Sequence, residues 1–222
     1  MLPLSLRRAL EVIMSKARAD WRRHQVVDDA QQKRLHSRRV GGWKAKKSGE
    51  SAEDLVEQMG RLYLEEGRAE LRKRPEPYRR IGAAKANGHF TAAPLSKSGP
   101  DFDLALPDGR AGLLELKTRK GKRIPLRAVG DVQAAALKRR VEWRGFGAVI
   151  ICLWDEGVPA RWWVIDWRRW EQATKHGYKS LSDQDLDRVA TPCSLGYALR
   201  PDWLPALLQA HEEASQRPWV DA

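Results

Sequence analysis

GPDFDLALPDGRAGLLELK, residues 99–117, mixes apolar and charged side chains in two short segments on either side of PDGR. Pro, Asp and Gly are typical of tight turns, so the sequence predicts a β-hairpin with strands at about 101–106 and 112–117. Four charged residues would then lie on these strands: Asp101, Asp103, Glu115 and Lys117. Charges are costly to bury unless they are paired or bind a metal. The segment is therefore either a hairpin with solvated edges or a functional site.

A helix and a short strand are expected before this hairpin. Residues 51–67 read SAEDLVEQMGRLYLEEG, with Ser51 as a helix N-cap, Asp54 three residues later and Gly67 as a stop signal. AELRKRP, residues 69–75, predicts a short strand that proline ends. The next segment, residues 78–98, has no sustained periodicity. A loop of this length in a compact domain is usually functional.

The elements after the hairpin complete an α/β pattern. Residues 124–145 predict a helix, and FGAVIICLW (146–154) and RWWVIDW (161–167) predict two strands. The helix is expected to bury Val129, Val132, Ala136, Leu137 and Val141. Short helices are expected at 180–190 and 201–214. The tryptophans of RWWVIDWRRW (161–170) and Trp203 are expected to pack in the core or at an interface rather than stack on bases. This order predicts an α/β domain with a central mixed β-sheet flanked by helices.

Positive charge is concentrated at the N-terminal end. The 222 residues include 41 Lys and Arg against 29 Asp and Glu, a formal charge of +12. Residues 1–48 hold 13 of these basic residues and only 4 acidic ones. An amphipathic helix pattern at 3–24 runs into a polar basic stretch within this arm. The arm predicts a polyanionic partner, most often nucleic acid, with a solvated basic helix as the alternative.

Hydropathy and cysteine content indicate the compartment. No apolar run has the length of about 20 residues that a membrane span needs. The first residues lack the order of a secretory signal, because arginines follow the leucines. The two cysteines, Cys152 and Cys193, favour reduced thiols over a disulfide framework and exclude a cysteine metal cluster. We expect a soluble, cytoplasmic protein with no membrane association.

The charges of the hairpin suit metal-dependent chemistry. Glu115 and Lys117 share one face of their strand, as do Asp101 and Asp103 on theirs. If paired residue numbers sum to about 217, a local bulge or a longer turn would bring either aspartate beside Glu115, and the spacing does not separate the two. Converging carboxylates raise each other's pKa, and a divalent cation removes that cost. A nearby lysine would then complete a site for metal-dependent phosphodiester hydrolysis.

Pro100-Asp101 followed by Glu115-Leu116-Lys117 resembles the signature of the PD-(D/E)xK nuclease superfamily. Further features in order resemble its branch of RecU-type Holliday junction resolvases. These features are Gly49 and Glu53 at a helix start, Tyr63 late in that helix, the basic strand LRKRPEPY, a long insertion before the aspartate, and TRKGKRIPLRAVGDVQ after the Glu-x-Lys strand. The resemblance covers residues 49–154 and implies a restriction-endonuclease-like core.

The resemblance also implies a role for each matched residue. Asp101 and Glu115 would bind Mg²⁺ or Mn²⁺, and Lys117 would orient a water molecule or stabilise charge. Gln133 would lie near the metal or the scissile phosphate, with a plain surface position on its helix as the alternative. Glu53 would support the metal from the first helix; alternatively, its charge only favours the helix N-terminus.

Basic residues around these motifs are the predicted DNA contacts. The insertion at 78–98 corresponds in position to the protruding stalk of the family, with a disordered surface loop as the alternative. Contacts to backbone phosphates are expected from Lys73, Arg79, Arg80, Lys85, Lys97, Arg119, Lys120, Lys122 and Arg123.

Three segments are expected: a basic helical N-terminal arm at 1–48, a nuclease core at 49–170 and a C-terminal helical extension at 171–222. The resemblance implies a homodimer that cleaves four-way (Holliday) DNA junctions during recombination and repair, leaving 5′-phosphate and 3′-hydroxyl ends. Two-fold symmetric incision needs two active sites, which a C2 dimer supplies. The alternatives are another nuclease of the superfamily, acting on flaps, ends or duplex DNA, and a non-catalytic DNA-binding protein.

Overall fold

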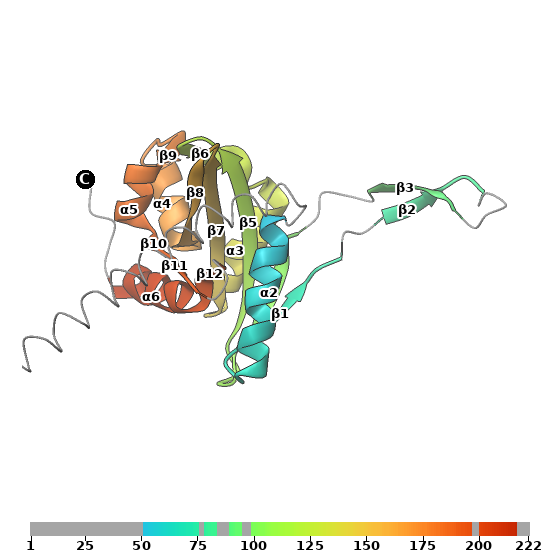
Figure 1. Ribbon diagram of the computed structural model, residues 1–222, viewed down its shortest axis with the longest axis horizontal. Helices are drawn as coiled ribbons and strands as arrows, with labels where there is room; N and C mark the ends of the chain where they lie inside the picture. The colour runs from blue at the N-terminus through green and yellow to red at the C-terminus, as the bar shows by residue number, and fades with distance from the viewer. Residues whose placement is uncertain (1–50, 76–77, 84–88, 95–98, 197–199, 217–222) are drawn as a thin grey trace, which may run out of the picture.

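A six-stranded mixed sheet forms the centre of the fold (Figure 1). The computed structural model describes residues 51–75, 78–83, 89–94, 99–196 and 200–216, so the predictions for the arm at 1–48 lie outside the described residues. The strands in spatial order are β1 (Glu70–Lys73), β4 (Phe102–Ala105), β5 (Ala111–Lys120), β7 (Phe146–Asp155), β8 (Val158–Asp166) and β10 (Thr191–Pro192). β5 and β7 pair in parallel, and the other neighbours pair antiparallel.

Helices cover both faces of this sheet. One face carries α2 (Ala52–Glu65) and α6 (Trp203–Gln216). The other face carries α3 (Asp131–Glu142), α4 (Trp167–Lys175) and α5 (Asp183–Val189). Strands β5 and β7 are therefore buried on both sides, which explains their nearly continuous apolar sequences. The predicted α/β architecture with a mixed sheet between helices is confirmed.

The hairpin of β4 and β5 has a different register from the predicted one. Phe102 pairs with Leu114 and Ala105 with Ala111, so the paired numbers sum to 216 rather than about 217. The connection sets this register: the backbone N–H of Leu106 donates to the carbonyl of Arg110 at 2.9 Å, and Gly109 takes a φ of 85° that favours glycine. Continued by one residue, this register sets Asp101 across from Glu115.

Of two predicted helices, one begins where the sequence predicts and the other begins later. α2 begins as expected, because the hydroxyl of Ser51 accepts the backbone N–H of Asp54 at 3.1 Å and the Asp54 carboxylate accepts the N–H of Ser51 at 2.8 Å. The helix expected over 124–145 is shorter: β6 (Arg123–Pro125) and a 3₁₀ turn at Leu126–Ala128 precede α3. Val132 is exposed rather than inward, because α3 starts only at Asp131 and turns this position to solvent.

The chain after residue 170 packs onto the same core. β10 pairs with β8 in the main sheet, and β9 (Ser180–Ser182) pairs with β6. β11 (Ser194–Leu195) and β12 (Pro201–Asp202) pair with each other just before α6. The expected boundary at 170 between core and extension is therefore not visible as a break in packing, because these elements cover the sheet that the earlier strands form.

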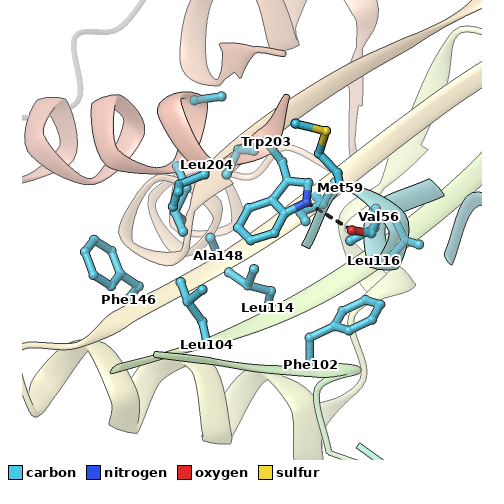
Figure 2. Packing of buried hydrophobic residues seen from close by; sticks show 14 of the residues in the cluster. Val56, Met59, Phe102, Leu104, Leu114, Leu116, Phe146, Ala148, Trp203 and Leu204 are labelled. Atoms are coloured by element: carbon cyan, nitrogen blue, oxygen red, sulfur yellow. Dashed lines mark hydrogen bonds between the residues drawn. The ribbon is translucent and has the colours of Figure 1, made fainter. Parts of the chain in front are cut away.

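Tryptophan side chains fill this core, as the sequence predicted. Trp163, Trp167, Trp170 and Trp203 are buried. Trp167 starts α4 instead of ending a strand, because the carboxylate of Asp166 accepts the N–H of Arg168 at 2.9 Å and caps the helix. The indole N–H of Trp203 donates to the carbonyl of Val56 at 3.3 Å, and its ring lies among side chains of α2, β4, β5 and β7 (Figure 2).

Replacing Trp203 by alanine is expected to lower the free energy of unfolding by about 3–5 kcal/mol, because it empties a fully buried site that joins α6 to α2. Urea unfolding followed by circular dichroism measures this change. Leu208→Ala on the same helix is the matched control and should cost about 1 kcal/mol or less, because Leu208 is exposed. An unchanged main transition in the Trp203 variant would contradict the packing described above.

The insertion at 78–98 forms a projecting hairpin. β2 (Tyr78–Ile81) and β3 (Thr91–Pro94) pair antiparallel and extend away from the body of the protein (Figure 1). On one face the rings of Tyr78 and Phe90 stack with centroids 6.2 Å apart, and the Arg80 guanidinium lies 5.7 Å from the Phe90 centroid. A paired hairpin, rather than an irregular loop, therefore occupies the described part of this segment.

Membrane-spanning helices are not found in the ranges that the structure describes, since no helix there combines the necessary length and apolar character.

Candidate active site

Asp101 and Glu115 lie together where β4 begins and β5 crosses the sheet. The Asp101 carboxylate accepts a hydrogen bond from the backbone N–H of Leu116 at 2.8 Å, which ties the start of β4 to the middle of β5. On the other side, the backbone carbonyl of Asp101 accepts the backbone N–H of Arg74, the residue that follows β1, at 2.8 Å. Two hydrogen bonds, one to the carboxylate of Asp101 and one to its carbonyl, therefore hold this aspartate beside Glu115.

Glu115 is the most deeply buried acidic residue of the motif, with a side chain only 1% exposed. Burial raises the pKa of Glu115 to about 7, and the charge of Asp101 adds to the rise, while the hydrogen bond from Lys117 opposes it. Among the described residues, the Oε2 atom of Glu115 has no hydrogen-bond partner of normal geometry. A buried oxygen without a partner is costly, so this atom is suited to a ligand that the chain itself does not provide.

Burial also raises the pKa of Asp101 above its usual value, and the nearby charge of Glu53 contributes to the rise, whereas the N–H of Leu116 and the charge of Lys117 lower it. Two neighbouring carboxylates therefore both resist ionisation in the absence of a cation. This is the electrostatic behaviour expected of a site that binds a divalent metal through hard oxygen ligands.

Lys117 connects the two carboxylates to α3. Its Nζ lies 2.5 Å from Oε1 of Glu115 and 3.4 Å from Oε1 of Gln133. Gln133 is the third residue of α3, and the same Oε1 accepts the backbone N–H of Gly130 at 3.1 Å. Gln133 therefore both caps its helix and contacts the ammonium of Lys117. The alternative reading of Gln133 as a plain surface residue does not account for these two contacts.

Asp103 lies outside this group. Its carboxylate is half exposed and lies 3.5 Å from Nε of Arg74. The register places it across from Leu113 on β5 and Arg72 on β1, two positions along the strand from the point where Asp101 meets Glu115. Of the two aspartates that the sequence could not separate, the structure brings Asp101 to Glu115.

Glu53 is close to this site but engaged elsewhere. Nζ of Lys73 lies 2.7 Å from a carboxylate oxygen of Glu53 and 3.3 Å from one of Glu57. Lys73, a predicted DNA contact, is thus paired with two acids, which raise its pKa. Sequence analysis missed Glu57, although its position one helical turn after Glu53 signals a shared face.

The other predicted DNA contacts divide into engaged and accessible groups. Lys120 pairs with Glu156 at 2.5 Å, and Arg123 donates from Nε to the hydroxyl of Ser180 at 3.1 Å. Arg119 and Lys122 are exposed and have no ion-pair partner among the described residues. Arg79 and Arg80 are exposed on β2 of the projecting hairpin. Lys85 and Lys97 lie outside the described residues.

The donor set for a metal is small. In the parts of the chain that the structure describes, no group of three His, Cys, Asp or Glu side chains is close enough to enclose an ion. Mg²⁺ commonly binds through one or two carboxylates, with water and phosphate oxygens completing its shell. Asp101 and Glu115, with the unpartnered Oε2 of Glu115, fit that donor chemistry.

An acidic pair and a lysine on neighbouring strands of a mixed α/β sheet are what the resemblance to PD-(D/E)xK nucleases implied. Among curated proteins, this chain is similar to the Holliday junction resolvase RecU of Bacillus subtilis (strain 168), with 27% identity over 172 residues. The alignment covers 73% of this chain and 81% of that protein. No family model matches the chain. The resemblance to RecU-type resolvases is confirmed by this similarity.

Raising the pH is expected to destabilise the metal-free protein between about pH 4.5 and pH 7. A carboxyl whose pKa is raised on folding keeps its proton to higher pH in the folded state, so stability is lost as that proton dissociates. Glu115→Gln removes this loss and should make the variant more stable than wild type at pH 8, by up to about 3 kcal/mol. Thermal melts in EDTA at pH 5 and pH 8 measure the difference.

Adding Mg²⁺ to the same melts provides the control. A ligand that binds only the folded state raises the melting temperature, so wild type should gain stability at pH 8 and Glu115→Gln should gain less. Parallel curves for the two proteins at both pH values, with and without Mg²⁺, would show that Glu115 neither titrates as described nor contacts the ion.

Proposed function

We propose that this protein is a metal-dependent endonuclease that cleaves four-way (Holliday) DNA junctions in the cytoplasm during recombination and repair. The observation that carries the proposal is the convergence of Asp101 and Glu115 beside Lys117, with one buried Glu115 oxygen that has no hydrogen-bond partner among the described residues. The similarity to a protein named as a Holliday junction resolvase supports the choice of substrate.

Asp101 and Glu115 would hold Mg²⁺ or Mn²⁺, and Glu53 would support it after Lys73 releases its carboxylate. When bound, such an ion supplies charge that polarises the phosphate and lowers the pKa of a water molecule. The buried setting of Glu115 strengthens every charge interaction in the site, because water screens it little. The backbone N–H of Leu116 keeps the Asp101 carboxylate oriented without blocking both of its oxygens.

Lys117 would act on the phosphate through its ammonium. Glu115 and Gln133 hold Nζ from two sides, so its position is set before the substrate arrives. An ammonium in place beforehand stabilises the negative charge that develops on the phosphate oxygens, and its N–H groups can orient the attacking water. Gln133 is thus a positioning residue that acts through Lys117.

A homodimer would present two such sites. A four-way junction has two-fold symmetry, and paired cuts in strands of like polarity need two active sites in the same symmetry. Exposed arginines on the β2–β3 hairpin, Arg79 and Arg80, would contact backbone phosphates, together with Arg119 and Lys122 at the end of β5.

Cleavage of labelled DNA tests the proposal. We would compare an immobile four-way junction, linear duplex and a flap of the same sequence, each with Mg²⁺, Mn²⁺ or EDTA. The expected result is symmetric cutting of the junction with either metal, no cutting in EDTA, and little cutting of linear duplex. Equal cutting of all three DNAs would overturn the choice of substrate, and no cutting of any DNA with either metal would overturn the nuclease itself.

A further inference from the structure

A groove of about 560 Å³ lies beside the candidate active site, between β1, β4, β5 and α3. Its wall is mainly basic and aromatic, and the residues that matter here are Arg74, Asp103, Leu113, Arg139, Arg140 and Trp143. Apart from Asp103, which the sequence left as an alternative to Asp101, none of them was singled out by the sequence motifs for a role in binding.

The groove lies on the same face of the sheet as the two carboxylates, next to them along β4 and β5. Leu113 precedes Glu115 by two residues on β5, so both side chains lie on the same face of the sheet. Arg74 donates its backbone N–H to the carbonyl of Asp101, and its guanidinium packs so close to Gly99 that a Cβ there would lie 3.0 Å from it. A DNA strand that leaves the candidate active site along this face of the sheet would therefore enter the groove.

Arginines give the groove its charge. Of the described residues in the groove wall, Asp103 is the single acidic one, and Arg74 already pairs with it at 3.5 Å. Arg139 and Arg140 have no ion-pair partner among the described residues. Both arginines lie in the last turn of α3, where the helix dipole favours positive charge. The dipole explains the arginines but not the exposed aromatic residue beside them.

Trp143 is 69% exposed, whereas Trp162, Trp163, Trp167, Trp170 and Trp203 are buried. It caps α3 at a turn in which the N–H of Gly145 donates to the carbonyl of Arg140 and the N–H of Arg144 to that of Val141, both at 2.9 Å. Arg144 takes a φ of 59° in this turn, a position where glycine is usual. The guanidinium of Arg139 lies 6.0 Å from the Trp143 ring. The indole is therefore presented to solvent on a defined backbone.

We infer that this groove binds an unpaired nucleotide of the DNA strand next to the scissile phosphate, with the base stacked on Trp143 and the phosphates held by Arg139 and Arg140. An exposed indole offers a π-face that any base can stack on, and neighbouring arginines follow the backbone of a single strand. The inference rests on the proposed nuclease function, because it gives that function a substrate feature: a base freed from its pair beside the cut.

Binding of a fluorescent oligothymidylate in EDTA tests this inference without requiring cleavage. Trp143→Ala is expected to lower affinity about tenfold, and Arg140→Gln several-fold, while Trp143→Phe keeps most of the affinity because it retains a ring. Arg61→Gln is the matched control: Arg61 is an exposed arginine of α2, on the opposite face of the sheet, and its loss should change little. Wild type should also lose tryptophan fluorescence on binding, and Trp143→Phe should lose less.

Three results would overturn the inference. These are unchanged oligothymidylate affinity in Trp143→Ala and Arg140→Gln, an equal loss in Arg61→Gln, and a change of oligomeric state on light scattering in Trp143→Ala, which would assign the groove to a subunit contact. Melting temperatures identify any variant that fails to fold. Failure of the proposed function looks different, because it appears as uncut junction DNA while the Trp143 variants still lose single-strand binding.

Discussion

Asp101→Asn is expected to reduce the rate of junction cleavage by about 10³-fold or more, because it removes one of two carboxylates that would hold the metal. Asp103→Asn is expected to stay within roughly fivefold of wild type, since it loses only an exposed ion pair with Arg74. Single-turnover cleavage, with protein in excess over DNA and at a saturating protein concentration, measures both rates. The two variants make the same chemical change two residues apart.

The folded structure should survive the Asp101 substitution. The amide oxygen of asparagine can still accept the backbone N–H of Leu116, which holds the start of β4 to β5. Burial raises the pKa of Asp101, so its charge is not expected to stabilise the fold, and the melting temperature in EDTA should not fall. Loss of cleavage in Asp103→Asn with normal activity in Asp101→Asn would reverse the assignment.

Lys117→Met is expected to reduce the cleavage rate by about 10²–10⁴-fold while junction binding in EDTA is retained, because in the proposed mechanism the ammonium would act on the reacting phosphate rather than on affinity. Methionine keeps the length and apolar stem of the side chain but leaves Glu115 without its ion-pair partner. The pKa of Glu115 should therefore rise further, since the hydrogen bond from Lys117 now lowers it.

Lys175→Met is the matched control for this substitution. Lys175 is also a lysine in an ion pair, 2.9 Å from Glu171, but it lies exposed on α4 and away from the carboxylates. The Lys175→Met variant should cleave the junction at nearly the wild-type rate. Equal losses in both variants would mean that general positive charge, rather than the position of Lys117, supports cleavage, and full activity in Lys117→Met would remove this lysine from the mechanism.

Local sequence signals predicted most elements of the fold. The side chains of Ser51 and Asp54 form the capping hydrogen bonds that start α2, and the turn sequence PDGR separates β4 from β5. The apolar run at 146–154 becomes β7, since a strand buried on both faces needs no polar alternation. These features depend on residues within a few positions of one another, so a linear reading can find them.

The sequence predicted which residue types form the candidate site, but it did not predict how these residues are arranged in space. The Glu-x-Lys pattern places Glu115 and Lys117 on one face of a strand whatever the neighbouring strands do. The choice between Asp101 and Asp103 depends on a register that differs by one residue from the expected one. Likewise, Lys73 is paired with Glu53 and Glu57 only because α2 and β1 pack side by side, which no spacing in the sequence reports.

Amino-acid order alone was sufficient for the α/β class, the acidic and basic motif and the burial of Trp203 and the tryptophans at 162–170, because side-chain period and hydrophobicity act locally. Packing between distant segments decided the rest: the contact of Asp101 with Leu116, the unpartnered oxygen of Glu115, the attachment of α6 to α2 through Trp203, and the exposure of Trp143. Each of these depends on which elements become neighbours, and the free energy that selects neighbours comes from the whole core rather than from any short segment.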